Sequence, residues 1–124
     1  MERKTKQRNA ILATLAAENR PLSTQEILEN AQKKVPNLGI ATVYRAVREF
    51  VDAGQITAIN LPGDPSQRYE IKGKHHHHHF WCRACGKLFE LEGCSGKLNI
   101  KTPKGFKTEL HEVIFRGLCP KCKT

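Results

Sequence analysis

In the first third of the chain, apolar residues recur at the spacing that is typical of amphipathic helices. Apolar side chains recur at helical spacing from about Thr5 to Glu18, and Thr5 is placed to cap that helix. Ser23 and Glu26 then have the spacing of a capping box, in which each side chain bonds the backbone N–H of the other residue. We therefore predict a second helix from about Thr24 to Lys33.

Residues 40–53 form a third predicted helix, and its two faces differ in chemical character. The apolar face carries Ile40, Val43, Val47, Phe50 and Val51. The opposite face is polar and carries Thr42, Arg45, Arg48, Glu49 and Asp52, with Tyr44 at the margin. Gly54 follows in the position of a helix C-cap glycine, so we expect the helix to stop there.

Two strands are predicted next, at residues 55–60 and 67–72, around a loop rich in proline and glycine. Three helices followed by a hairpin is the element order of a winged helix-turn-helix, in which the last helix enters the DNA major groove. Arg45 could pair with guanine, Tyr44 could reach a thymine methyl group or a phosphate, and basic N-terminal residues would contact phosphates. The alternative is that the polar face of the third helix is only solvated.

The second half of the chain begins after Gly73 and Lys74, which we interpret as a hinge. Strands are expected at residues 75–82, 87–91 and 108–118, with a short helix from about Cys94 to Ile100. The predicted fold class is therefore α+β, with a winged-helix domain at 1–72 and a small α/β domain at 75–124. An open edge strand in that second domain would favour pairing with another copy of the chain.

Two C-x2-C pairs, Cys82 with Cys85 and Cys119 with Cys122, flank most of this second domain. Such a pair points both sulfur atoms to one side of a tight turn, so two pairs can surround one structural Zn²⁺ tetrahedrally. Two disulfides, or four unrelated core cysteines, are the alternative. Because five cysteines cannot all pair within a chain and no secretory signal opens the sequence, a metal site in a reducing compartment is favoured.

Five consecutive histidines, residues 75–79, run directly into the first cysteine pair. In an extended strand, alternate side chains face opposite sides, so His75, His77 and His79 would face one way and His76 and His78 the other. One strand could therefore supply ligands to two different metal sites. An expression tag or a solvated polar tract is the alternative, although the internal position of the run argues against a tag.

Composition narrows the choice of partner. The 124 residues carry a formal charge of +9, which favours a polyanionic partner. No apolar run is long enough to span a bilayer, so we expect a soluble, cytoplasmic protein with no membrane partner. No H-E-x-x-H motif, phosphate-binding glycine loop or catalytic triad is present, so neither enzymatic activity nor a small-molecule substrate is expected.

Several motifs in order along the chain resemble the ferric uptake regulator (Fur) family of metal-dependent bacterial repressors, which includes iron, zinc, manganese and peroxide sensors. Residues 5–8 look like the T-x-Q-R motif of the first helix, and residues 41–45 followed by 52–54 are similar to the recognition helix. The histidine-rich strand and the two cysteine pairs complete the match. The resemblance covers nearly the whole chain.

The resemblance implies a homodimer that binds palindromic operator DNA when it is loaded with metal. It places the structural zinc on the four paired cysteines and a regulatory divalent metal, Fe²⁺ or Zn²⁺ with Mn²⁺ also in the family's range, between the domains. The implied regulatory ligands are Glu70, His77, His79 and Glu90, and a further site would use His76, His78 and His111. The implied DNA-contacting residues are Lys4, Arg8, Thr42, Tyr44, Arg45 and Arg48.

The chain also departs from the family pattern. Family members often supply a sensory histidine from the loop before the second helix, where this chain has Arg20 and Pro21. Many zinc-sensing members carry a cysteine near the end of the second wing strand, where Ile71 and Lys72 stand. Lys97 stands near the position from which the family commonly gives a carboxylate to the further site.

The family pattern does not explain Cys94. It lies near Glu90 and Glu92 and could add a sulfur ligand beside the histidines of the further site. The alternative is a buried small apolar residue or an incidental thiol. A mixed sulfur and nitrogen site would favour Zn²⁺, whereas imidazoles and carboxylates also suit Fe²⁺ or Mn²⁺.

A rival interpretation of the whole chain is a zinc or nickel carrier or storage module. In it the histidine run would buffer the metal, and the four cysteines would only hold the fold. This interpretation leaves the polar face of the third helix and the hairpin without a role.

Overall fold

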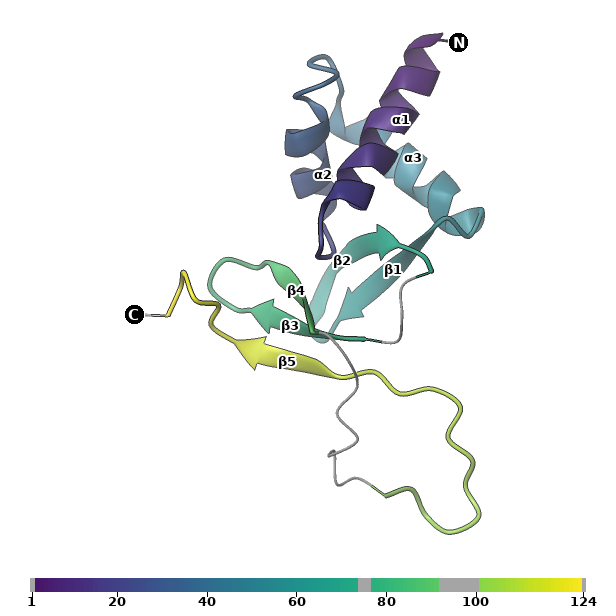
Figure 1. Ribbon diagram of the computed structural model, residues 1–124, viewed down its shortest axis with the longest axis vertical. Coiled ribbons are helices and arrows are strands. Elements are labelled where there is room, and N and C mark those ends of the chain that lie inside the picture. The colour runs from purple at the N-terminus through teal and green to yellow at the C-terminus, as the bar shows by residue number, and fades with distance from the viewer. Residues whose placement is uncertain (1, 74–76, 92–100, 124) are drawn as a thin grey trace. The chain divides into compact units, whose positions relative to one another are not determined.

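The computed structural model describes residues 2–73, 77–91 and 101–123, and the chain divides into two compact units, residues 1–74 and 75–124 (Figure 1). The first unit holds α1 (Glu2–Ala17), α2 (Thr24–Ala31), α3 (Ile40–Asp52), β1 (Ile56–Leu61) and β2 (Asp64–Ile71). The second holds β3 (His78–Cys82), β4 (Leu88–Leu91) and β5 (Ile114–Gly117). The predicted α+β class is confirmed. None of the described helices is both long and apolar enough to cross a membrane.

The core of the first unit forms where the apolar faces of its three helices meet. Ile11 from α1, Ile27 from α2 and Phe50 from α3 are almost completely buried there. The loop before α2 is bonded to the hairpin, because Leu22 and Tyr69 exchange two backbone hydrogen bonds of 2.9 and 2.8 Å. These bonds join the hairpin to the loop between α1 and α2 within the first unit.

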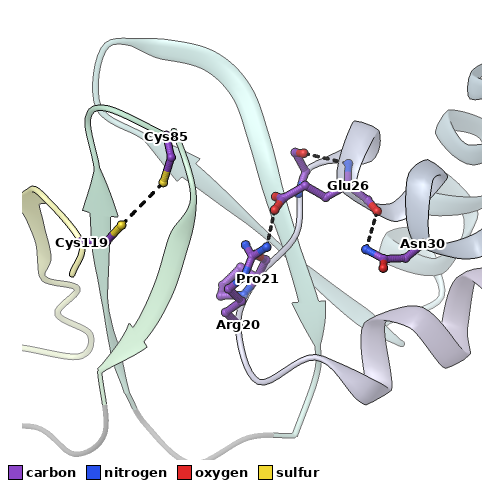
Figure 2. Close-up of polar contacts among 7 residues, drawn as sticks. Arg20, Pro21, Glu26, Asn30, Cys85 and Cys119 are labelled. Carbon is purple, nitrogen blue, oxygen red and sulfur yellow. Dashed lines mark hydrogen bonds and ion pairs between the residues drawn. The ribbon is translucent and has the colours of Figure 1, made fainter. Parts of the chain in front are cut away.

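The predicted capping box at the start of α2 is confirmed. The Ser23 side chain accepts a hydrogen bond from the Glu26 backbone N–H at 3.1 Å, and the Glu26 carboxylate accepts one from the Ser23 N–H at 3.0 Å. The Arg20 guanidinium also donates to that carboxylate and to the Pro21 carbonyl (Figure 2). One glutamate therefore joins the α1–α2 loop to the first turn of α2.

This network lowers the pKa of the Glu26 carboxyl group. Burial raises the pKa of its carboxyl group, but hydrogen bonds from Arg20 and Ser23 outweigh burial, and the pKa lies below its ordinary value of 4.5. A group whose pKa is lowered by folding stabilises the folded state above its unfolded pKa. The contribution of Glu26 is therefore present at neutral pH and is lost as the pH falls from about 4.5 through the lowered pKa.

Removing the Ser23 hydroxyl should destabilise the first unit. The Ser23→Ala variant leaves the Glu26 N–H without its capping acceptor, and such losses cost about 1 kcal/mol of unfolding free energy. We expect a lower urea midpoint with an unchanged m-value. The Thr24→Ala variant removes the neighbouring hydroxyl but leaves the capping box, and equal midpoints for the two variants would contradict a stabilising cap.

Two helix boundaries and the exposure of one helix residue differ from the sequence prediction. α1 begins at Glu2, so Thr5 lies inside the helix and its prediction as the N-cap was wrong. Glu2, Arg3 and Lys4 are favourable helix residues with no breaker among them, so the helix extends over them. α2 ends at Ala31, two residues early, with Gln32 as its C-cap. Ile40 is 38% exposed instead of buried, because it is the first residue of α3 and no preceding turn covers it.

The hairpin turn is tighter than predicted. Leu61 pairs with Asp64, so only Pro62 and Gly63 lie between β1 and β2, where a loop over residues 61–66 was expected. Gly63 has a φ of +77°, a conformation that glycine adopts without steric cost. A shift of register between Asn60 and Leu61 admits Pro65 into β2, since proline is tolerated in a strand at a bulge.

The second unit is a three-stranded mixed sheet in the order β4-β3-β5 (Figure 1). β3 runs antiparallel to β4 and parallel to β5, with His79 opposite Ile114 and Cys82 opposite Gly117. A Cβ atom at Gly117 would lie 3.1 Å from the Phe80 ring, so glycine permits this close approach. Because the pairing is parallel, the segment after β5 begins at the same end of the sheet as Cys82.

The last strand is shorter than its sequence pattern suggested. A strand over residues 108–118 was predicted, but residues 108–113 are irregular and only β5 is extended. A strand extends only as far as it has a partner to bond with, and β3 pairs with β5 only from His79 to Cys82. His111 therefore lies outside the strand. The helix predicted at 94–100, and the ligands predicted at His76 and Cys94, fall outside the described residues.

Candidate metal centres

The four paired cysteines converge in the second unit. Cys82 ends β3 and Cys85 follows in the turn to β4, while Cys119 and Cys122 lie in the turn after β5. Their sulfur atoms all lie within 4.8 Å of one another, and the Cys85 and Cys119 sulfurs are 3.9 Å apart (Figure 2). Four thiolates around one Zn²⁺, each about 2.3 Å from the ion, would lie about 3.8 Å apart. The cluster therefore fits a tetrahedral zinc site.

The same geometry bears on the disulfide alternative. All four cysteines are free thiols, and a disulfide needs sulfur atoms about 2.05 Å apart. The separation of 3.9 Å between Cys85 and Cys119 is much longer, and it is the spacing of two ligands of one ion. The described thiols thus have the arrangement of metal ligands rather than of a covalent crosslink.

Backbone N–H groups stabilise the thiolate form of one cysteine, which is the form that binds a cation. The Cys85 N–H at 3.5 Å and the Cys119 N–H at 3.4 Å point at the Cys82 sulfur and lower its pKa to about 6. Sulfur neighbours Cys119 and Cys82 raise the pKa of Cys122 to about 12. These backbone N–H groups favour the thiolate form of Cys82, and a cation bound among the four sulfur atoms would favour loss of the remaining thiol protons.

Within the described part of the histidine run, residues 77–79, the side chains lie on two faces, as the alternation predicted. The rings of His77 and His79 lie together, with centroids 4.8 Å apart. His77 Nε2 lies 3.5 Å from a carboxylate oxygen of Glu90, which is opposite His79 in the β3–β4 register. Two imidazoles and a carboxylate are a ligand set that suits Zn²⁺, Fe²⁺ and Mn²⁺. Glu70, the fourth predicted ligand, is buried on β2 of the first unit.

His78 faces the other way and lies beside His111, with ring centroids 5.1 Å apart. His78 Nδ1 accepts a hydrogen bond of 3.2 Å from the Val113 N–H, which orients the ring. In the part of the chain that the structure describes, this face brings together two of the four residues predicted for the further site.

The outer face of α3 is exposed, as predicted from its polarity. Arg45 and Arg48 are exposed, and Tyr44 is 55% exposed. The Arg45 guanidinium donates to the Thr42 hydroxyl at 3.3 Å, which extends the arginine along the helix surface. This face presents donors of the kind that bond base edges and phosphates.

A groove of about 470 Å³ lies between the start of α1 and α3. It is lined by Arg3, Lys4, Gln7, Arg8, Thr42, Arg45, Ala46 and Glu49. Lys4 and Arg8 were predicted to contact DNA, whereas Arg3 and Gln7 were not. The spacing of residues 3, 4, 7 and 8 would have placed all four on one helical face.

Arg8 is already engaged within the protein. Its guanidinium forms an ion pair with the Glu49 carboxylate on α3, and it lies over the Phe50 ring at 4.7 Å from the centroid. Arg8 was predicted to contact DNA phosphates, and a phosphate would have to compete with Glu49 for it.

Comparison with known proteins gives a consistent result. The family model described as "Ferric uptake regulator family" matches residues 2–116. A ferric uptake regulation protein of Campylobacter jejuni is 32% identical over 95% of this chain and 78% of its own length. The peroxide-responsive repressor PerR of Staphylococcus epidermidis is 30% identical over 96% of this chain and 80% of its own.

The fold has similar solved structures. The ferric uptake regulator of Helicobacter pylori, described as having three functional metal-binding sites, aligns with a TM-score of 0.70. The alignment covers 94% of this chain and 79% of that one at 26% identity.

Proposed function

Because the chain belongs to the ferric uptake regulator family, whose members are metal-responsive transcriptional regulators and not enzymes, we propose that it is a transcriptional repressor that controls metal-ion homeostasis. In this proposal a metal-loaded homodimer binds palindromic operator DNA. Free thiols at the four-cysteine cluster need a reducing compartment, for which we propose the cytoplasm.

The exposed outer face of α3 is the observation that carries the proposal. Arg45 would read a base edge in the major groove, and Tyr44 would contact a thymine methyl group or a phosphate. Thr42 and Arg48 would add contacts on the same face, and Lys4 and Arg8 would contact the backbone from α1. Phosphate contacts position the protein and base contacts give specificity, so Arg45 should matter most for sequence preference.

Cys82, Cys85, Cys119 and Cys122 would hold a structural zinc. Tetrahedral thiolate sites leave no open coordination position, so the role of this site is to stabilise the fold. The second unit has few buried apolar side chains among its described residues, chiefly Leu88 with Cys82 and Cys119. A unit of this size gains much of its stability from a metal staple.

The regulatory metal, for which we propose Fe²⁺ or Zn²⁺ with Mn²⁺ as a further candidate, would be bound by His77, His79 and Glu90 together with Glu70. The proximity of the two imidazoles and the Glu90 carboxylate supports this set. Ligands drawn from both units would restrict the hinge at residues 73–74. His76, His78, His111 and Cys94 remain candidates for a further site.

Restricting the hinge would couple metal binding to the affinity for operator DNA. Two recognition helices fit successive half-sites of an operator only when they are about 34 Å apart. A dimer with a free hinge samples many spacings, so metal binding raises the fraction that fits. By linkage, operator DNA must tighten metal binding by the same factor, typically about 5-fold to 150-fold.

The test is an operator titration with and without the removable metal. The operator is first selected from random DNA with metal-loaded protein, and metal content per chain is measured by elemental mass spectrometry before and after mild chelation. We expect one chelation-resistant zinc, at least one removable metal, and operator binding that weakens by about 5-fold to 150-fold after chelation. Equal affinities for the operator with and without removable metal would refute the proposal.

His77→Ala should remove this response, since it deletes one of the proposed regulatory ligands. The matched control is His111→Ala, which removes an imidazole from the other face of the sheet and leaves His77, His79 and Glu90 unchanged. We expect the operator affinity of the His77→Ala variant to be insensitive to chelation and that of the His111→Ala variant to remain sensitive. A chelation response that persists in His77→Ala would place the sensor elsewhere.

A further inference from the structure

We propose that Glu49 is a built-in counter-charge that weakens sequence-independent DNA binding by occupying Arg8, an inference that rests on the proposed DNA-binding function. Glu49 lies on α3, next to the residues proposed to read bases, but its carboxylate points into the groove between α1 and α3. It therefore acts through Arg8 as a positioning residue.

The charges in the groove suggest this role. Four basic side chains line it, Arg3, Lys4, Arg8 and Arg45, and they are the kind of cluster that binds a phosphate backbone. A single carboxylate, that of Glu49, also lines it and forms the ion pair with Arg8. A DNA phosphate that approaches Arg8 would meet a negative charge already at its guanidinium.

The Arg8 side chain is held on both sides. The Glu49 carboxylate binds its guanidinium, and the Phe50 ring, which belongs to the core, packs beneath it at 4.7 Å. Yet neither partner is fully covered, since the Arg8 and Glu49 side chains are 32% and 49% exposed. The pair is therefore accessible to solvent and to a competing phosphate. Because neither side chain is part of the buried core, we expect removal of one of these charges to leave the protein folded.

The consequence for regulation follows from the location of the pair. Both residues belong to the first unit and neither is a proposed ligand of the regulatory metal, so we expect the pair to form with and without that metal. Phosphate contacts carry no sequence information and raise affinity for any duplex. By occupying Arg8, Glu49 lowers the affinity that remains without metal, so the metal-free protein dissociates readily from DNA.

The variant Glu49→Gln tests this directly. Glutamine keeps the shape of the side chain but gives Arg8 only a neutral partner, so Arg8 becomes able to bind a phosphate. We expect affinity for poly(dI-dC) to rise roughly tenfold at about 0.1 M salt, and the slope of log K against log salt to steepen by about 0.9. Both changes should be equal with and without the regulatory metal.

Two comparisons make the result specific. Glu29→Gln removes an equal charge from an exposed residue of α2, and we expect little change in the slope for that variant. In an Arg8→Gln background, Glu49→Gln should also have no effect on the slope, because no arginine is left to release. The inference is overturned if the slope of Glu49→Gln equals that of the wild type or of Glu29→Gln, or if the effect persists without Arg8.

These measurements separate this inference from the proposed function. Binding to poly(dI-dC) needs no operator and no regulatory metal, so the slopes decide the role of Glu49 even if metal-dependent repression fails. Conversely, unchanged slopes would leave metal-dependent operator binding intact.

Discussion

Replacing Cys82 by serine is expected to release the structural zinc and unfold the second unit. The Cys82 sulfur is completely buried and receives N–H groups from both cysteine turns, so the sulfur lies at the centre of the cluster. Structural zinc in small domains contributes about 10–16 kcal/mol of apparent binding free energy, which is also folding free energy. Few apolar side chains are buried among the described residues of this unit, so little else compensates for its loss.

Zinc content by elemental mass spectrometry and near-ultraviolet circular dichroism at the single Trp81 measure this effect. The matched control is Cys94→Ser, which removes the fifth cysteine and should retain the chelation-resistant zinc. The first unit should keep its helical signal, because its core is built from α1, α2 and α3. A Cys82→Ser protein that retains one tightly bound zinc and a native Trp81 spectrum would show that the cluster is not a structural site.

Replacing Arg45 by glutamate is expected to abolish specific operator binding. A bidentate arginine–guanine contact contributes about 1–3 kcal/mol of discrimination, and a carboxylate at that position also repels the phosphates nearby. We expect a loss of more than about a hundredfold in operator affinity, measured by fluorescence anisotropy with metal-loaded protein. Arg45 is exposed on α3, so the folded state should be little affected.

The control for this charge reversal is Lys33→Glu, which makes the same change in net charge at an exposed residue after α2. It should weaken operator binding only slightly. The variant also separates the repressor from a metal carrier, because Arg45→Glu should leave metal content and metal transfer unchanged. Operator affinity in Arg45→Glu equal to that in Lys33→Glu would exclude α3 as the recognition helix.

The positions where helices and strands begin and end were the least predictable features of this fold. Thr5 has the chemistry of an N-cap, but three good helix formers precede it and the helix begins earlier. The alternation after Thr108 resembles a strand, but strand structure needs hydrogen bonds from a partner, and β3 bonds β5 only as far as its own edge extends. Local pattern gives the tendency of a segment, whereas the neighbouring element sets its length.

Local sequence spacing was enough to predict most of the helices and strands and the types of ligand. The capping box at Ser23, the two faces of α3 and the alternation of the histidines depend on spacings of a few residues, which helix and strand geometry convert directly into direction. The spacing of the two C-x2-C pairs likewise predicts four thiol ligands. These features are local, so no distant contact was needed to predict them.

The contacts by which distant residues meet depend on the tertiary structure. The parallel pairing of β3 with β5 brings Cys119 and Cys122 to Cys82 and Cys85, and no short-range pattern encodes that pairing. The packing of α1 on α3 likewise joins Arg8 to Glu49, two residues that seemed independent in the sequence. Such contacts depend on how the apolar faces pack together, because burial of those faces fixes the crossing of the elements and so selects the polar partners at their edges.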